Sequence, residues 1–245
     1  MAQALLQAAP AALDRGDGLT EAVAQAEIDL LARRVGRVLQ DRSPAAVARG
    51  FAQVLFQELG FRREIEATEP RYHLLPSVLT HRRGSCVGLV SVYLVVAERL
   101  GIPMAAELVP GHLHLRLAGS PPLLIETLRH GEVVDQRFYQ EKYIGSRRLG
   151  PAYRRPLTAQ ELVAVIRFNL GNHHRDRGQA ARAEADYLAA AEAFPAFAEA
   201  RASLGLVQHA RGDVDAARRA YQAAARVDAW LPGLAENLAA LDAAE

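Results

Sequence analysis

The C-terminal third of the chain repeats itself at an interval of 34 residues, and no other part of the sequence restricts the fold as strongly. Small, apolar and aromatic residues recur at this interval: Leu170 with Leu204, Gly171 with Gly205, Gly178 with Gly212, Ala183 with Ala217, Tyr187 with Tyr221, and Ala190 with Ala224. A period of this length is typical of helical hairpins that stack on one another. The small residues allow two helices to approach closely, and the tyrosine fills the groove between them. We therefore predict that the chain ends in an all-α array.

The pattern Leu-Gly…Ala…Tyr…Ala resembles the tetratricopeptide repeat. On this resemblance we place one repeat at about 164–197 and a second at about 198–231, followed by a capping helix, so that the array occupies 158–245. Repeats of this kind imply a surface that docks a peptide or protein partner. The alternative is that so short an array only buttresses the rest of the chain.

The composition of the 245 residues excludes several classes of protein. Apolar residues make up 50% of the chain and charged residues 23%, which excludes a largely disordered protein. Because 29 basic residues face 28 acidic ones, the net charge of +1 provides no field that attracts nucleic acid or an anionic membrane. No stretch approaches the ~20 consecutive apolar residues of a membrane span. We expect neither a nucleic-acid partner nor a membrane, and the oligomeric state stays open.

Two further observations concern the location of the protein. Residues 1–15 lack a basic leader before their apolar stretch, so we expect no secretory signal. The single cysteine, Cys86, excludes an internal disulfide and fits a reducing compartment. We predict a cytoplasmic protein.

The first part of the chain differs from the array. We separate an N-terminal segment, 1–19, from a domain at 20–150 in which helical and strand patterns are mixed. An apolar stripe predicts a helix over 20–40, and Ser43 followed by Pro44 predicts the start of a second helix that runs to Gly60. The prolines and arginines of 145–157 predict a solvated hinge, with a patch for phosphate or an acidic partner as the alternative.

The segment with the most chemical information begins at Gly84. From Val87 to Ala97 the sequence is almost wholly apolar, which predicts a helix that is buried over most of its circumference and ends at Gly101. Cys86 then lies in the first turn of this helix. The partial positive charge of a helix N-terminus favours the thiolate, which is the reactive form of cysteine. Taken alone, however, Cys86 is better explained as a small apolar residue of the core.

Two histidines downstream change this interpretation. The stretch His112-Leu113-His114-Leu115-Arg116-Leu117 alternates strictly, which predicts a strand with both imidazoles on one face. AGSPP then predicts a turn, and LLIETL the returning strand of an antiparallel hairpin. Opposed residues in a hairpin share a constant index sum: a sum of 240 places Glu126 opposite His114, and a sum of 238 places it opposite His112. A cysteine, a histidine and a carboxylate that orients the histidine form a site for thiol-based acyl transfer.

Three segments in this order, HRRGSCVGLVSVYLVVAERLGIP, PGHLHLRL and IETLRHGEVVDQRFY, resemble the transglutaminase-like superfamily. The resemblance is greatest to the SirB-type bacterial branch, in which such a core is followed by tetratricopeptide repeats. It begins near Thr20 and covers about nine-tenths of the chain. The resemblance implies an α+β papain- or transglutaminase-like core with N-terminal helices, followed by the all-α repeat array.

The resemblance also implies a role for each of three residues. Cys86 stands at the position of the nucleophile, His112 at that of the base, and Glu126 at that of the acid that orients the base. The superfamily usually has aspartate at the third position, so the side chain here is longer by one methylene. The hairpin arithmetic favours His114 as the base and the resemblance favours His112; we choose His112 and keep His114 as the alternative.

Three hypotheses follow for the function. The main one is a cysteine-dependent acyl-transfer enzyme of the peptidase, amidase, deamidase or transglutaminase type, which acts on a peptide or protein amide without a cofactor. The second is a non-catalytic scaffold for protein interactions with a vestigial site, because many SirB-type members carry proline where Cys86 stands. The third is a zinc or iron site formed by His112, His114 and Glu126. We expect no metal, since Cys86 is explained without one.

Four other residues carry expectations that a structure can test. Arg82 and Arg83 precede Gly84, and we predict that they bind a substrate carboxylate or stabilise a thiolate; the alternative is that they are solvated loop residues. His73 is expected at the surface. Trp230 is expected to pack against the capping helix.

Overall fold

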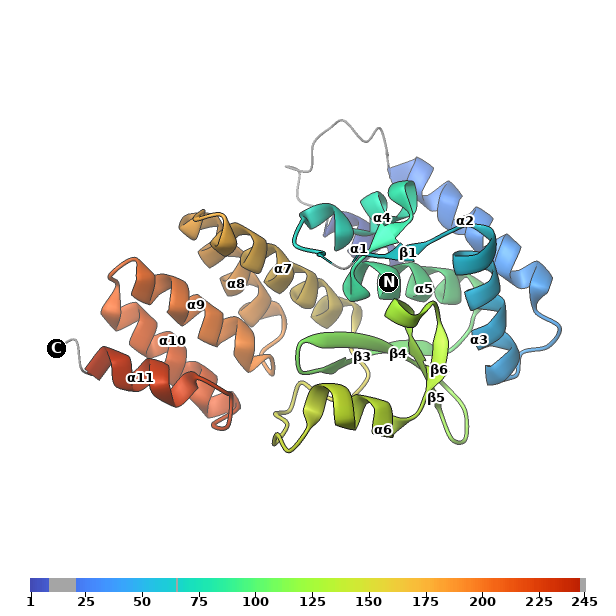
Figure 1. Cartoon of the computed structure of the whole chain (residues 1–245). Coiled ribbons are helices and arrows are strands. Elements are labelled where there is room, and N and C mark those ends of the chain that lie inside the picture. Colours follow the sequence, from blue (N-terminus) through green and yellow to red (C-terminus); the bar gives the residue numbers. More distant parts are fainter. Residues whose placement is uncertain (9–20, 65, 243–245) are drawn as a thin grey trace. The chain divides into compact units, whose positions relative to one another are not determined.

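The computed structural model describes residues 1–8, 21–64 and 66–242 (Figure 1). They form two compact units, one made of Met1–Gly145 and Arg154–Ala159 and the other of Ser146–Tyr153 and Gln160–Glu245. Of the expected N-terminal segment 1–19, residues 2–7 form the short helix α1 (Ala2–Gln7), whereas 9–19 lie outside the described residues. Thr20, where the family resemblance begins, and residues 9–15 of the region expected to lack a secretory leader also lie outside them.

The first unit begins with helices that the sequence largely predicts. α2 (Glu21–Val38) is followed by α3 (Pro44–Ala52), which continues as the π-helical segment η1 (Gln53–Glu58). The expected N-cap is confirmed, because the Ser43 side chain accepts a hydrogen bond from the backbone N–H of Ala46 at 3.3 Å. Beyond them lie a parallel strand pair and two short helical segments: β1 (Arg62–Arg63), η2 (Pro70–Tyr72), α4 (Leu75–His81) and β2 (Arg83–Gly84).

Helix α5 (Cys86–Leu100) forms the centre of the first unit. All its residues from Val87 to Ala97 are buried, as the apolar sequence predicts. The helix ends at Gly101, whose left-handed backbone (φ 61°) suits glycine and whose N–H reaches the last turn. Within the core the Tyr93 ring stacks on Phe51, with the ring centroids 4.9 Å apart.

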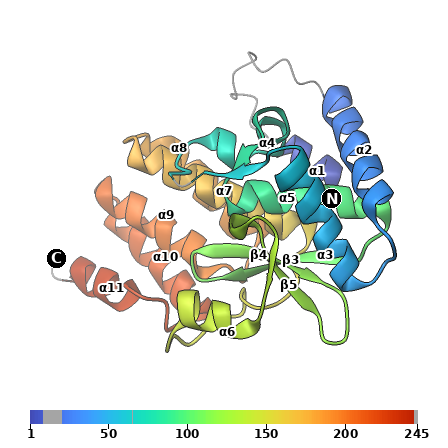
Figure 2. The same ribbon diagram turned by 45° about the vertical axis from the view of Figure 1, so that its right-hand side comes forward.

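An antiparallel sheet packs against α5. Its strands follow chain order: β3 (Met104–Val109), β4 (His112–Leu117), β5 (Leu123–Glu126) and β6 (Glu132–Val134). A 3-10 turn, η3 (Thr127–Arg129), joins the last two strands. Helix α5 lies along one face of the sheet, while α6 (Gln136–Tyr139) and the π-helical η4 (Gln140–Ile144) lie along the other (Figures 1 and 2). This mixed α+β core is consistent with the expected fold class.

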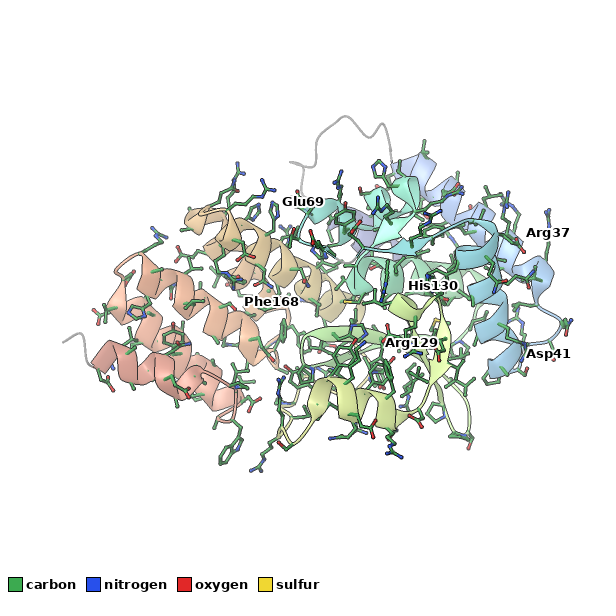
Figure 3. The ribbon with its side chains drawn as sticks, in the orientation of Figure 1. Arg37, Asp41, Glu69, Arg129, His130 and Phe168 are labelled. Carbon is green, nitrogen blue, oxygen red and sulfur yellow. The ribbon has the colours of Figure 1, made fainter. Side chains whose placement is uncertain are left out.

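The second unit is helical: α7 (Ala159–Asp176), α8 (Ala180–Ala193), α9 (Ala198–Ala210), α10 (Val214–Val227) and α11 (Leu234–Asp242). The repeated glycines and tyrosines meet between neighbouring helices. A Cβ atom added at Gly171 would lie 2.7 Å from the Tyr187 ring, and one added at Gly205 would lie 2.7 Å from the Tyr221 ring. Only glycine permits this approach. Phe168, labelled in Figure 3, fills the same interior against Tyr187 and Phe197.

Two features concern the surface of the protein. In the described part of the chain, no helix combines the length and the hydropathy that crossing a bilayer requires. The expectation for Trp230 is wrong, since its side chain is 64% exposed. The guanidinium of Arg148 stands over the indole ring at 5.2 Å.

Candidate active site

Cys86 is the first residue of α5, and the residue is half-buried. Ser85 caps the helix: its hydroxyl oxygen accepts a hydrogen bond from the Gly88 N–H at 3.3 Å. The N-terminal position places the thiol beside the partial positive charge of a long buried helix, which stabilises an anion there.

A second segment of the chain fixes this helix terminus. The Tyr72 carbonyl accepts hydrogen bonds from both the N–H and the hydroxyl of Ser85, at 2.8 and 3.0 Å. Since the single hydroxyl proton of Ser85 is used there, Nδ1 of His73 must be the donor in its 2.9 Å contact with the same oxygen. Close packing adds to the constraint, because a Cβ atom at Gly88 would lie 2.3 Å from the Tyr72 oxygen. The cysteine backbone is therefore held by neighbours on several sides.

His73 thus corrects a prediction. It was expected at the surface, but it is only 4% exposed and its ring supports the N-cap next to Cys86. A single histidine in a segment without clear periodicity gives no local signal of burial. The contact joins residues 12 positions apart, and only the folded chain brings them together.

The hairpin has the first of the two expected registers. Leu115 pairs with Ile125 and Leu117 with Leu123, so the index sum is 240 and Glu126 comes opposite His114. The carboxylate nevertheless reaches diagonally to the other histidine: Nε2 of His112 donates to Oε2 of Glu126 at 2.7 Å. Diagonal neighbours on one face of a sheet lie within reach of long side chains, and the extra methylene of glutamate extends that reach.

Glu126 is held as an ionised acceptor. It is 1% exposed, and its second oxygen accepts the backbone N–H of Leu128 at 2.9 Å. Burial by itself raises the pKa of this carboxyl, but the hydrogen bond and the charge of His112, together with the Leu128 N–H, lower the pKa below its usual value. Both oxygens are therefore acceptors and neither carries a proton.

His112 completes the arrangement. Burial disfavours the charged ring, yet hydrogen bonding and charge interactions with Cys86 and Glu126 outweigh burial and raise the pKa of His112 to about 9. Because Nε2 is bound to Glu126, Nδ1 is the ring nitrogen left to interact with the thiol. Near neutral pH the site can therefore hold an imidazolium next to Cys86.

His114 faces a different environment. Its Nε2 lies 4.0 Å from Oε2 of Glu107, and its Nδ1 makes a long contact of 3.4 Å with the Leu115 carbonyl. Burial lowers the pKa of His114 to about 4, so the ring is neutral. The structure thus brings Cys86, His112 and Glu126 together and leaves His114 beside this group.

The two arginines before Gly84 make contacts within the protein. Nη1 of Arg82 donates to the Leu59 carbonyl at 2.9 Å, and Nη2 of Arg83 lies 2.7 Å from Oε2 of Glu64. Arg82 also ends α4 in a left-handed backbone conformation (φ 55°). These contacts position the strand that leads into Cys86, and a role in binding substrate stays a prediction.

Two tyrosines that the sequence did not single out as catalytic lie over the histidines. The Tyr143 ring is parallel to that of His112, with the centroids 4.4 Å apart and an interplanar angle of 6°. The Tyr139 ring stacks on His114 at 3.9 Å. Burial, followed by the charges of Glu126 and Cys86, raises the pKa of Tyr143 to about 12, so its hydroxyl stays neutral. An aromatic pair spaced by four residues is typical of any packed helix face, and it carries no signal of a site.

Within residues 1–8, 21–64 and 66–242, no group of three or more histidine, cysteine, aspartate or glutamate side chains is arranged to hold a metal ion. Of the three ligands in the metal hypothesis, His112 binds Glu126 at 2.7 Å, while Nε2 of His114 lies 4.0 Å from a different carboxylate, that of Glu107.

The chain is similar to known proteins in sequence and in fold. The profile of the transglutaminase-like superfamily matches residues 22–166, which include all three residues of the group. A UPF0162 protein of Pseudomonas aeruginosa is 32% identical over 185 residues, which is 73% of this chain and 68% of that protein. A UPF0162 protein of Xylella fastidiosa is 29% identical over 178 residues, 72% of this chain and 54% of the relative.

Among solved structures, menin has a similar fold. The TM-score is 0.54 at 15% sequence identity, over 85% of this chain. The chain spans about half the length of menin, as it does of the Xylella relative, since the shares covered are 51% and 54%. At this identity the likeness concerns the fold alone.

Proposed function

The chain belongs to the transglutaminase-like superfamily, and on this premise we propose that it is a cysteine-dependent acyl-transfer enzyme that acts on a peptide or protein amide. The observation that carries the proposal is the connected group of Cys86, His112 and Glu126, in which a buried carboxylate binds Nε2 of the imidazole at 2.7 Å. This is the arrangement that a thiol nucleophile needs: a base next to it and an acid that orients the base.

The first half of the reaction forms an acyl-enzyme. His112 takes the thiol proton at Nδ1, and the Cys86 sulfur attacks the amide carbonyl carbon, so that a C–S bond forms and the carbonyl oxygen becomes an oxyanion. Since the N–H groups of Ser85 and Gly88 are bound within the protein, the donors left in this first turn are those of Cys86 and Val87. The C–N bond then breaks, and the leaving amine takes the proton from His112.

The second half releases the acyl group. Water gives hydrolysis or deamidation, whereas an amine gives a new amide bond. In either case His112 accepts the proton of the attacking group, the C–S bond breaks, and the thiolate returns. Glu126 stays ionised throughout, holding Nε2–H so that Nδ1 is the nitrogen that exchanges protons.

We further propose that the helical array consists of tetratricopeptide repeats of the SirB-type branch and docks the peptide or protein partner. The matched pairs Gly171–Tyr187 and Gly205–Tyr221 support this, because the same close contact recurs after 34 residues. Large apolar side chains are also exposed on this unit, namely Leu188, Leu206 and Trp230. A cytoplasmic location suits the proposal, since a reducing compartment keeps the only thiol free.

The test measures the pH dependence of Cys86 alkylation by iodoacetamide. The chain has no other cysteine, so mass spectrometry of the intact protein reports this thiol alone. We expect the wild type to react well below the free-thiol value of ~8.5, His112→Ala to react only as a free thiol does, and Cys86→Ser not to react. His114→Ala should resemble the wild type. A wild-type profile with its midpoint near the free value and unchanged by His112→Ala would refute the proposal.

The second candidate function is the non-catalytic scaffold, which the exposed apolar residues of the array favour. Two variants separate the alternatives in a strain that lacks the gene. Gly205→Val places a branched side chain against Tyr221 and disrupts the array, whereas Cys86→Ser only replaces the sulfur atom with oxygen. If Cys86→Ser restores the cellular role and Gly205→Val does not, the scaffold is correct and the enzyme is wrong.

A further inference from the structure

Two tyrosines of the segment formed by α6 and η4 pair one to one with the two histidines of β4. Tyr143 covers His112 and Tyr139 covers His114. The spacing explains the match: side chains two residues apart on a strand are separated by about 6.6–6.8 Å, and four residues along a helix return to the same face. The two tyrosine rings lie 6.1 Å apart, close to the strand repeat.

The groups that face His112 come from five elements. Cys86 lies on α5, Glu126 on β5, His114 on the same strand, and Tyr139 and Tyr143 on the segment opposite α5. Cys86 and Glu126 interact with polar atoms at the ring edge. Tyr143 is the neighbour that stacks closely on the face of the ring, at 4.4 Å and almost parallel; the Tyr139 centroid is 6.3 Å away.

The contact on the face matters because edge contacts alone do not fix an imidazole plane. The second torsion of a histidine side chain has a broad, roughly two-fold energy profile. The contacts with Glu126 and Cys86 hold the two ring nitrogens, and the plane can still tilt about the line that joins them. A flat ring against the face removes this freedom. The negative face of an aromatic ring also attracts a cation, so the contact favours the imidazolium.

We propose that Tyr143 is a positioning residue for His112, and that its ring, rather than its hydroxyl, keeps Nδ1 of the imidazole directed at Cys86. The inference rests on the proposed function, in which His112 is the base. Tyr143 does not touch the reacting atoms in this role. It acts through the orientation and charge of the imidazole.

The segment offers a matched control. The Phe138 ring contacts both tyrosines and meets the Tyr143 ring edge to face, with the centroids 6.3 Å apart. The guanidinium of Arg129, labelled in Figure 3, lies 5.3 Å from the centroid of the Phe138 ring. Phe138→Leu therefore removes an aromatic ring from the same segment without removing the ring that stacks on His112. Both Phe138 and Tyr143 are half-buried, so leucine can replace either side chain with a similar change in packing.

The experiment compares the pH profile of Cys86 alkylation in Tyr143→Phe, Tyr143→Leu, Phe138→Leu and the wild type. We expect Tyr143→Phe to keep the wild-type profile, because the ring remains. Tyr143→Leu should react about 3- to 10-fold more slowly below pH 7, which corresponds to the loss of one stacked pair, and its profile should move to higher pH. Tyr143→Met serves as a second ring-free variant, and circular dichroism verifies that each variant is folded.

Three results would overturn the inference. A wild-type profile in Tyr143→Leu and Tyr143→Met shows that the ring does not position His112. An equal loss in Phe138→Leu shows that any loosening of the segment has the same effect. If the wild type itself reacts as a free thiol and His112→Ala changes nothing, the proposed function fails and the inference fails with it; in the first two cases the proposed function stands.

Discussion

Replacing Glu126 with glutamine tests how the carboxylate controls His112. The change keeps the length of the side chain and removes its charge. Both carboxylate oxygens now accept hydrogen bonds, one from Nε2 of His112 and one from the Leu128 N–H. An amide has one oxygen and one NH2 group, so it cannot accept both bonds. Either the Leu128 N–H loses its acceptor, or His112 changes tautomer and presents a protonated Nδ1 to Cys86.

The strength of the hydrogen bond between Glu126 and His112 sets the expected change in the pKa of His112. A hydrogen bond to a charged group contributes roughly 1.5–3 kcal/mol, which is about one to two pKa units. The pKa of His112, raised to about 9 by Cys86 and Glu126 against the effect of burial, should therefore fall to roughly 7–8 in Glu126→Gln. The unpaired donor in a site that is 1% exposed should lower the free energy of unfolding by about 1–3 kcal/mol.

Two measurements follow this change. NMR titration of the labelled histidine rings, with the His112 signal assigned by its absence from His112→Asn, gives the pKa, and urea unfolding gives the stability. Glu132→Gln is the matched control, because it makes the same change at an exposed residue that pairs with Glu126 across the sheet. If the pKa of His112 stays near 9 in Glu126→Gln, or if both glutamine variants lose equal stability, the assigned role of the carboxylate is wrong.

Three further expectations can be measured on the purified protein. Because the pKa of His112 is raised to about 9 in the folded protein, the charged ring stabilises the fold fully below the usual value of 6.5, and this stabilisation is lost as the pH rises through about 9. The free energy of unfolding should therefore fall by about 3 kcal/mol over this range. Equal urea midpoints at pH 6.5 and 9 would contradict this. Gly88→Ala should cost about 1–3 kcal/mol, because the new methyl group would lie 2.3 Å from the Tyr72 oxygen, and an unchanged melting temperature would show that the helix terminus can shift freely. Gly205→Ala should lower the unfolding midpoint of the helical unit, since the new methyl group would lie 2.7 Å from the Tyr221 ring. Fluorescence of the single tryptophan, which lies in that unit, reports the transition. A wild-type midpoint would argue against tight packing of Gly205 on Tyr221.

Local sequence patterns predicted the elements that carry the site. The apolar run after Cys86 predicted the buried helix, and Ser43 predicted a capped helix start. The alternation after His112 predicted the strand and left two registers open, of which the structure has the first. Each of these features depends on neighbours within a few positions, where periodicity and capping chemistry act. The 34-residue repetition similarly predicted where glycine and tyrosine meet in the helical unit.

The remaining features depend on contacts that no local pattern contains. The diagonal bond from His112 to Glu126 follows from side-chain length and not from register. The stacking of Tyr143 on His112 joins segments that are distant in sequence. Trp230 is exposed because its position after the last repeated helix places it beside Arg148 and away from the core. Hydropathy depends only on the type of a residue, so it does not predict which distant residues contact it in the folded chain.

Trapping of an acyl-enzyme tests the central claim most directly. The protein is incubated with a peptide library that contains backbone and glutamine amides, in the presence of hydroxylamine, which converts a thioester into a hydroxamate. We expect hydroxamates with the wild type, a mass increase on the peptide that contains Cys86 when hydroxylamine is left out, and neither with Cys86→Ser. If no peptide yields a hydroxamate or an acylated Cys86, while alkylation shows that the thiol is reactive, then the group of cysteine, histidine and glutamate does not transfer acyl groups from peptide amides.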